Sequence, residues 1–333
     1  MAGKIITSTI APELPRKEHN PYHGVDLEFI TIDTVCDHDL FLLQEGRYVL
    51  YRKRSLPFSM KDKQRLEQTR NKTIYVFCAD EQELRRFYEA NLPNIIENPN
   101  IPTEKKAQVL YECATGISHE IFSNPDNVET IGKSKVVVDN TMSLLAKGSD
   151  AFLQIISLSS HDYYTYTHSV NVMTFTVALL SALGIKDERV LKEAGMGALL
   201  HDIGKAKVPL EVLNKPGPLN DDEWTVMRKH PSFGFEMLSE APVPERGRDI
   251  VIQHHEKING VGYPYGLRGD AIPLISQVVS ICDAYDAMTT NRVYQKAKKP
   301  FDAFKIITKE MYGHFNPKVI EQFIFLLNLK NKK

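Results

Sequence analysis

The chain has 333 residues, enough for about two domains at roughly 150 residues each. Apolar residues make up 42% and charged residues 25%, which is typical of a soluble globular protein and excludes fibrous and disordered classes. The formal net charge of −1 provides no overall attraction to nucleic acid or an anionic membrane, so we expect neither as a partner. No apolar run approaches the roughly 18 residues that span a bilayer, and the N-terminus lacks an apolar signal segment; we expect a cytoplasmic protein.

The first part of the chain predicts a small α+β domain over residues 1–95. Four short segments rich in β-branched and aromatic residues predict strands: 27–32, 39–43, 46–52 and 73–78. Segments 59–70 and 79–92 have helical composition, and Asp80 is the expected N-cap of the second. No nucleophile, phosphate-binding loop or metal-spaced cluster occurs here, so these residues do not show what the domain does.

Residues 91–103 hold three prolines and four asparagines, which predicts that helices end there and that a domain boundary follows. The apolar spacing of residues 103–124 predicts an amphipathic helix, 123–126 interrupt it, and 128–148 resume a helical pattern. We therefore expect a helical linker over 103–147 and an all-α domain over 148–333. The apolar stripes of the linker also suggest a homodimer, as a hypothesis.

Four cysteines are scattered along the chain without a CxxC pair: Cys36, Cys78, Cys113 and Cys282. This pattern predicts buried thiols rather than a disulfide framework or a thiolate zinc site. A metal site would have to draw on the eleven histidines and the carboxylates, which suits iron, manganese or zinc.

Histidines and aspartates recur on apolar helical segments of the second domain. His168 lies one helical turn before an apolar stripe. Taken alone, this position is explained by a core histidine that is hydrogen-bonded to a carbonyl. His201 and Asp202, however, directly follow the apolar run 195–200. A buried ionised carboxylate costs several kcal/mol unless it is paired or binds a metal, so this pair predicts a cation nearby.

The same pattern continues further along the chain, with His230, the pair His254 and His255, and Asp283 after the apolar run 278–282. Core packing alone does not need five such histidines and two aspartates. Seven ligands are also too many for one tetrahedral zinc with an open position. They suit two metals bridged by a shared carboxylate and a water.

Four segments occur in an order that resembles the HD-GYP domain, a branch of the HD superfamily of metal-dependent phosphohydrolases: HDIGK (201–205), KHPSFG (229–234), HHEKINGVGYPYG (254–266) and SICDAYDAM (280–288). The resemblance covers about residues 162–325. It implies a helical bundle that binds two divalent metals, usually iron or manganese, and hydrolyses cyclic di-GMP to pGpG or GMP.

The resemblance also implies roles for individual residues. It makes Asp202 the bridging carboxylate of a seven-residue ligand set: His168, His201, Asp202, His230, His254, His255 and Asp283. Some members bind a third metal through a glutamate one turn before the first histidine. Tyr164 occupies that position here, so we expect two metals. Asp162 matches an aspartate on the substrate or extra-metal side.

Phosphodiester chemistry explains why two metals are needed. The substrate is anionic and resists nucleophiles, whereas two metals neutralise its oxygens and turn a bridging water into hydroxide at neutral pH. Lys205 lies three residues after Asp202 and can point into the same site. We assign it to stabilising phosphate charge and protonating the leaving oxygen.

The substrate contacts are expected from two further segments. Gly262 and Tyr263 belong to the turn-rich GYP loop beside the substrate. Arg292 matches the family's basic residue that contacts phosphate or guanine. A second basic residue is expected three positions later, where Gln295 stands with Lys296 next to it.

Three functions therefore stay open. The leading hypothesis is a cyclic di-GMP phosphodiesterase that its N-terminal domain regulates through the helices between Thr103 and Lys147. That domain resembles the small sensor or interaction domains that precede HD-GYP regions, and its ligand is unknown. The second is a binding module that senses cyclic di-GMP, or docks a diguanylate cyclase (GGDEF) protein, without turnover. The third is hydrolysis of a related cyclic dinucleotide such as cyclic GMP-AMP. The complete ligand set and Lys205 favour catalysis, whereas Tyr164 and Gln295 depart from the family pattern.

Overall fold

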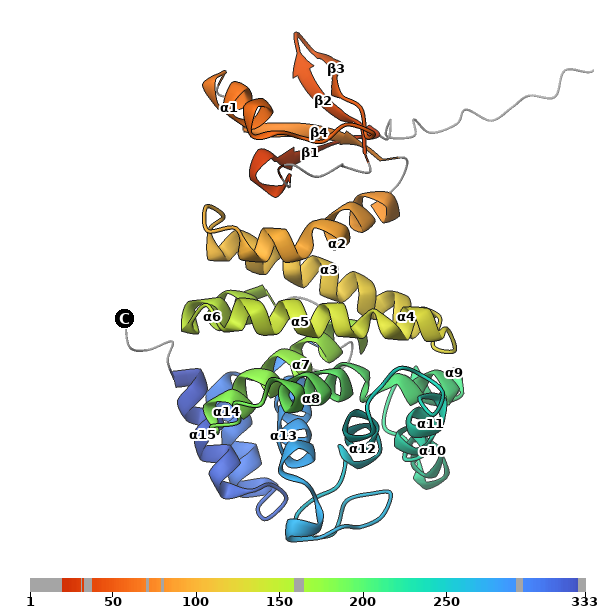
Figure 1. Cartoon of the computed structure of the whole chain (residues 1–333). Helices are drawn as coiled ribbons and strands as arrows, with labels where there is room; N and C mark the ends of the chain where they lie inside the picture. The colour runs from red at the N-terminus through yellow and green to blue at the C-terminus, as the bar shows by residue number, and fades with distance from the viewer. Residues whose placement is uncertain are drawn as a thin grey trace, which may run out of the picture. The chain divides into compact units, whose positions relative to one another are not determined.

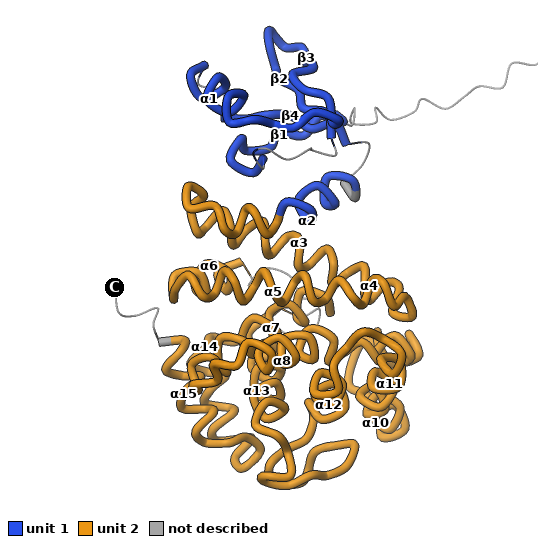
Figure 2. Tube along the Cα trace, viewed as in Figure 1, with its two compact units in different colours: residues 1–91 blue, residues 92–333 orange. Residues whose placement is uncertain are grey.

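The computed structural model describes residues 20–30, 32, 38–69, 72–78, 81–158, 165–291 and 296–328. The chain divides into two compact units, residues 1–91 and 92–333 (Figure 2). The predicted fold class is confirmed, because an antiparallel sheet is followed by a chain that is almost entirely helical (Figure 1). Cys36 and the predicted N-cap Asp80 lie outside the described residues, and the other three cysteines are buried, as expected.

Unit 1 is built on a four-stranded antiparallel sheet of order β1-β4-β2-β3. Its strands are β1 (Tyr22–Asp26), β2 (Leu40–Gln44), β3 (Arg47–Arg52) and β4 (Thr73–Phe77). The hairpin between β2 and β3 turns at Glu45 and Gly46, which both have positive φ (48° and 78°), as a two-residue hairpin loop requires. Leu40, Ile74 and Val76 are fully buried in its core. Helix α1 (Met60–Gln68) matches the predicted segment.

The first predicted strand is wrong. Residues Leu27–Phe29 form a short 3₁₀ turn, η1, and the strand β1 lies just before them. The Asp26 side chain accepts a hydrogen bond from the backbone N–H of Glu28 (3.2 Å), which caps the turn and ends the strand. Leu27 and Phe29 are nevertheless buried, so their apolar character reflects core packing rather than strand pairing.

The predicted break between helices is present, because α2 ends at Glu97 and α3 begins at Thr103, but α2 continues further into the segment 91–103 than its prolines suggest. Helix α2 (Glu81–Glu97) runs through Pro93, and the division between the two units falls inside it. A proline inside a helix costs about 3 kcal/mol because it removes one hydrogen bond and crowds the preceding turn. Burial offsets this cost, since Leu92, Ile95 and Ile96 are almost completely buried.

Unit 2 consists of helices, and α3 and α4 confirm the predicted amphipathic helix and its interruption. The long helices are α3 (Thr103–Ser123), α5 (Ser134–Leu145), α6 (Ser149–Leu158), α7 (Thr165–Ala182), α8 (Glu188–Leu200), α12 (Glu245–Gln253), α13 (Leu274–Thr289) and α15 (Pro317–Asn328). The shorter ones are α4 (Val128–Gly132), α9 (Leu210–Leu213), α10 (Asp221–Met227), α11 (His230–Met237) and α14 (Pro300–Lys305), with 3₁₀ turns η2 (Ile203–Lys207) and η3 (Gly269–Ala271) and a π turn η4 (Ile306–Glu310).

Helix α7 is the centre of unit 2. It packs against α3, α8 and α13, and α12 packs against α8 in turn. Val172, Met173 and Leu179 are fully buried on it. This packing holds rigid the helix ends that carry the predicted metal ligands. No helix within the described ranges is both long and apolar enough to cross a bilayer.

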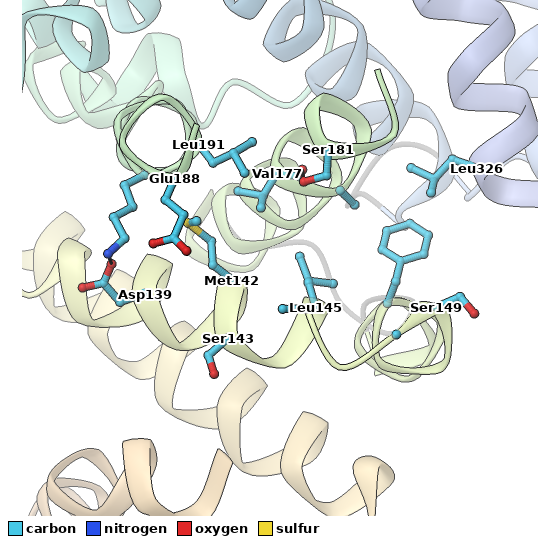
Figure 3. Close-up of a pocket in the computed structure, with 15 residues that line it drawn as sticks. Asp139, Met142, Ser143, Leu145, Ser149, Val177, Ser181, Glu188, Leu191 and Leu326 are labelled. Carbon is cyan, nitrogen blue, oxygen red and sulfur yellow. Dashed lines mark hydrogen bonds and ion pairs between the residues drawn. The ribbon is translucent and has the colours of Figure 1, made fainter. Parts of the chain in front are cut away.

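A cavity of about 620 Å³ lies among α5, α6, α7, α8 and the end of α15 (Figure 3). Apolar side chains such as Leu145, Val177 and Leu191 make up much of its lining. Lys192 and Asp139 form an ion pair at its edge (3.1 Å). None of the predicted metal ligands lines it, so this cavity is separate from the candidate site.

Candidate metal centre

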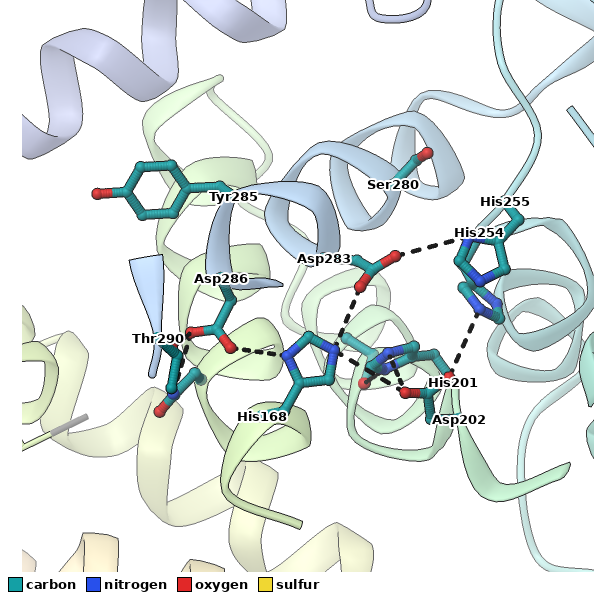
Figure 4. Close-up of polar contacts among 12 residues, drawn as sticks. His168, His201, Asp202, His254, His255, Ser280, Asp283, Tyr285, Asp286 and Thr290 are labelled. Atoms are coloured by element: carbon teal, nitrogen blue, oxygen red, sulfur yellow. Dashed lines mark hydrogen bonds and ion pairs between the residues drawn. The ribbon is translucent and has the colours of Figure 1, made fainter. Parts of the chain in front are cut away.

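The side chains of all seven predicted ligands come together in unit 2, from five helices. Figure 4 labels all of them except His230. They lie in the first turn of α7, at the ends of α8 and α12, at the start of α11, and within α13. Their potential donor atoms form two groups in which all atoms lie within 4.8 Å of one another: Asp202, His230, His254 and His255; and His168, His201 and Asp202.

Asp202 belongs to both groups, and each of its two oxygens faces a different pair of histidines. Its Oδ1 lies 3.3 Å from His230 Nε2 and 3.9 Å from His254 Nε2. Its Oδ2 lies 3.4 Å from His201 Nε2 and 3.9 Å from His168 Nε2. This is the arrangement expected of a carboxylate placed between two cations.

Asp283 spans the two groups in the same way. Its Oδ1 lies 3.2 Å from His168 Nε2, and its Oδ2 lies 3.7 Å from His255 Nδ1 (Figure 4). Two donor atoms that each lie about 2.1 Å from one metal, at right angles, are about 3 Å apart. The observed separations are therefore close to those between neighbouring ligands of a shared ion.

Backbone carbonyls fix the orientation of three of the rings. Helix ends leave carbonyls without a partner along the helix. Three histidine Nδ1 atoms lie at hydrogen-bond distance from the carbonyl oxygen three residues earlier: His201 from Ala198 (2.7 Å), His230 from Met227 (2.8 Å) and His254 from Val251 (2.7 Å). A carbonyl only accepts, so Nδ1 carries the proton in each ring and the Nε2 lone pair points into the cluster.

This orientation leaves lone pairs facing one another. His230 Nε2 and His254 Nε2 are 3.2 Å apart, and with both protons on Nδ1 neither nitrogen can donate to the other. His201 Nε2 is buried without a hydrogen bond among the described residues. A divalent cation would satisfy all three nitrogens, and imidazole and carboxylate donors suit iron, manganese or zinc. The residues present therefore fit a metal site.

The protonation states agree with this interpretation. Burial lowers the pKa of His230 to about 4, and burial together with neighbouring imidazoles holds the pKa of His254 well below its usual range. Burial alone would raise the pKa of Asp202, but Lys205, whose Nζ lies 2.6 Å from Asp202 Oδ2, and the rings of His201 and His230 hold it well below its usual range. At neutral pH the rings of His230 and His254 are thus neutral and the Asp202 carboxylate is ionised, which are the forms that bind a metal.

Asp286, which was not among the predicted site residues, orients His168. Asp286 Oδ2 lies 2.7 Å from His168 Nδ1, and Asp286 Oδ1 accepts from Asn171 Nδ2 (3.0 Å) and from the Thr290 hydroxyl (3.2 Å) (Figure 4). Tyr111 on α3 donates in turn to Asn171 (3.2 Å). A carboxylate behind a ligating histidine fixes its tautomer and raises its basicity. Its position three residues after Asp283, on the same face of a helix, was the available sequence pattern.

The predicted GYP loop does lie against the centre. The Tyr263 ring is 4.8 Å from the His255 ring. Glu256 is buried and accepts backbone N–H bonds from Tyr265 (2.7 Å) and Leu267 (2.9 Å), which fixes the loop. A Cβ on Gly262 would come within 2.4 Å of the Lys257 backbone nitrogen, so the loop needs glycine there for close backbone packing.

The remaining predicted contacts include several residues that the structure does not describe. Asp162, Tyr164, Arg292 and Gln295 lie outside the described residues. Lys296 is exposed, in the segment that leads into α14.

The fold and the cluster define a class: a helical domain whose converging helix ends build a buried His/Asp metal site. A family model described as HD domain matches residues 151–319, about half of the chain. The chain therefore belongs to the HD domain family, which confirms the predicted relationship.

Individual relatives agree with this assignment. A Pseudomonas aeruginosa protein named cyclic di-GMP phosphodiesterase is 40% identical over 189 residues, which cover 56% of this chain and 45% of the relative. A Thermotoga maritima protein of the same name is 34% identical over 263 residues, 76% of this chain and 71% of the relative. The chain thus spans less than half the length of the first relative and about 70% of the second.

A solved structure shares the fold. It is an HDG"Y"P protein from Bdellovibrio bacteriovorus, with a TM-score of 0.64 and 22% sequence identity. The alignment covers 92% of this chain and 99% of the solved one.

Proposed function

We propose that this chain is a metal-dependent phosphodiesterase that hydrolyses cyclic di-GMP to pGpG or GMP. The observation that carries the proposal is the Asp202 carboxylate between two histidine pairs, with the Nε2 atoms of His230 and His254 facing each other at 3.2 Å. The names of the two relatives supply the substrate.

The cofactor of this proposal is a pair of divalent ions, iron or manganese. One would be held by Asp202, His230, His254 and His255, and the other by His168, His201, Asp202 and Asp283. When bound, such ions neutralise phosphoryl charge and make water acidic enough to attack at neutral pH.

The chain's own residues provide the remaining functions. Hydrolysis adds a water oxygen to phosphorus, breaks one phosphorus–oxygen ester bond, and leaves an oxygen that takes a proton. Lys205 contacts Asp202 and is 21% exposed, so its ammonium can both offset phosphate charge and protonate that oxygen. Tyr263, beside His255, is assigned to the substrate. The resemblance adds four further substrate contacts: Asp162, Gly262, Arg292 and Lys296.

The test is hydrolysis of labelled cyclic di-GMP by the full chain, prepared without air and loaded with iron(II) or manganese(II). We expect metal-dependent release of pGpG. His201→Ala and Asp202→Ala should abolish it, and Lys205→Ala should lower kcat about 100-fold while the metal content stays unchanged. Lys207→Ala, an exposed lysine two residues further on, is the matched control.

Two outcomes would contradict the proposal. Tight binding of cyclic di-GMP without product would make the protein a binding module. Faster turnover of cyclic GMP-AMP than of cyclic di-GMP would make the related dinucleotide its substrate.

We further propose that unit 1 regulates the helical unit in the cytoplasm, and that a diguanylate cyclase and a second copy of the chain are partners. The apolar stripe of α3 is buried within unit 2, so a homodimer would have to use other side chains, such as the exposed Val128 and Val136. Light scattering at micromolar concentration tests the dimer, and a monomer would contradict it.

A further inference from the structure

The guanidinium group of Arg228 lies near two aromatic rings, and one of them, Tyr263, contacts His255 of the metal centre. Arg228 follows α10, and its guanidinium carbon lies 5.9 Å from the centre of the Trp224 ring and 5.7 Å from that of Tyr263. Both distances fall within the range of a cation–π interaction. Ring contacts of this kind hold the position of the guanidinium, because the positive group is attracted to the ring faces.

The hydrogen-bonding groups of Arg228 are not used by a carboxylate. Within the part of the chain that the structure describes, no acidic oxygen lies within 4.0 Å of it, and its side chain is exposed. A guanidinium presents five N–H donors around its edge, and aromatic rings do not consume them. Trp224 is itself 44% exposed, which is a large apolar surface to leave in water. The N–H donors of Arg228 and the exposed ring of Trp224 therefore lie next to each other, where both can contact a ligand.

Tyr263 connects Arg228 to the metal centre. The Tyr263 ring contacts the His255 ring at 4.8 Å, and His255 faces Asp283. The side chains of His255 and Asp283 are 23% and 14% exposed, whereas those of His168, His201 and His254 are at most 1% exposed. The centre thus opens toward solvent beside the same side chain that Arg228 contacts.

We propose that Arg228 binds the half of a cyclic dinucleotide that lies away from the scissile phosphate, with Trp224 as a surface for a base. This inference rests on the proposed function. A cyclic dinucleotide has two phosphates and two bases, and the metal centre engages one phosphate. The other half offers paired acceptors in one plane, either the two free oxygens of the second phosphate or guanine O6 and N7. A guanidinium fork matches both.

The experiment compares Arg228→Ala, Arg228→Lys and the wild-type full chain, with Lys229→Ala as the control that removes the neighbouring exposed charge. The dissociation constant for cyclic di-GMP is measured by calorimetry on metal-free protein, and kcat and KM on metal-loaded protein. Bis(p-nitrophenyl) phosphate, a diester without a base or a second phosphate, reports the metal centre alone.

We expect Arg228→Ala to raise the dissociation constant and KM for cyclic di-GMP roughly 10- to 100-fold, with kcat and the small diester little changed. Arg228→Lys should recover only part of this, because lysine lacks the planar fork. An equal loss with cyclic di-GMP and cyclic GMP-AMP assigns Arg228 to phosphate, and a smaller loss with cyclic GMP-AMP assigns it to guanine.

Binding measurements test the role of Arg228, whereas hydrolysis by the wild type tests the proposed function. If Arg228→Ala binds cyclic di-GMP within twofold of wild type and Lys229→Ala, the inference is overturned, whatever the turnover. A parallel loss of activity on the small diester also overturns it, since the effect would then act on the centre. If the wild type hydrolyses neither diester, the proposed function fails, and the calorimetric comparison still decides the role of Arg228.

Discussion

Asp286 contacts His168 Nδ1, on the opposite side of the ring from the Nε2 atom that faces Asp202 and Asp283. We expect Asp286→Ala to lower metal affinity about 10- to 100-fold, because His168 loses the acceptor that orients its ring. Metal content after dialysis against a fixed free concentration of manganese measures this effect.

Two control variants test whether the loss of metal is specific to Asp286. Asn171→Ala removes a neighbour of Asp286 but leaves its contact with His168, so the metal should stay bound. Asp302→Asn changes an exposed carboxylate on α14 and should have no effect. Equal metal content in Asp286→Ala and wild type would show that His168 does not need this contact.

At the scale of elements, η2 and α11 pack so closely that only glycine fits between them. A Cβ on Gly204 would lie 2.0 Å from the His230 carbonyl oxygen and 2.4 Å from the Gly234 nitrogen, and both atoms belong to the backbone. We expect Gly204→Ala to destabilise unit 2 by about 2–3 kcal/mol, since α11 must shift and carry His230 with it. Trp224, the only tryptophan of the chain, reports the unfolding of unit 2.

The control for this change is Gly132→Ala at the end of α4. Its nearest neighbour would be Pro242 Cγ at 3.6 Å, an ordinary contact, so stability should stay within about 1 kcal/mol of wild type. If both alanine variants unfold at the same urea concentration, the close packing of η2 on α11 is not a determinant of stability.

Asp62 in helix α1 makes the free energy of unfolding of unit 1 depend on pH. Burial alone would raise the pKa of Asp62, but hydrogen bonds from Ser59 and Arg52 outweigh it and lower the pKa from 3.8 to about 2. A pKa that is lower in the folded state stabilises the fold above pH 4, and this contribution is lost as the pH falls through 2. Asp62→Asn should therefore destabilise unit 1 by about 2 kcal/mol at pH 7 and by much less near pH 2. Hydrogen exchange of β4 amides in urea measures both values, and a difference independent of pH would contradict the argument.

The sequence predicted the convergence of the seven histidine and aspartate side chains better than it predicted local structure, and the reason is physical. A buried ionised carboxylate is costly unless it is paired or binds a metal. Asp202 and Asp283 each follow an apolar segment, so the sequence alone predicted a cation near them. The strand expected over 27–32 depended on local propensity, which the Asp26 cap and the burial of Leu27 override. Pro93 lies inside α2, where the burial of Ile95 offsets its cost. The contact between Arg228 and Tyr263 joins segments 35 residues apart and has no local pattern.

At the scale of the whole molecule, the two units differ in what can stabilise them. Every candidate ligand belongs to residues 92–333, whereas the sheet belongs to residues 1–91 and has its own core. A ligand that binds only the folded state stabilises it by about 2.7 kcal/mol at 100 times its dissociation constant. Metal should therefore protect unit 2 directly, through the helices that hold the centre.

We expect manganese to slow hydrogen exchange in α7, α8 and α13 and to leave β2, β3 and β4 unchanged. In parallel, unfolding followed by Trp224 fluorescence should shift to higher urea concentration. The Asp202→Ala chain is the control, because it lacks the carboxylate shared by both groups and should show neither effect. Metal-dependent protection that persists in Asp202→Ala would place the ion elsewhere, and equal protection of the sheet would show that the centre also stabilises unit 1.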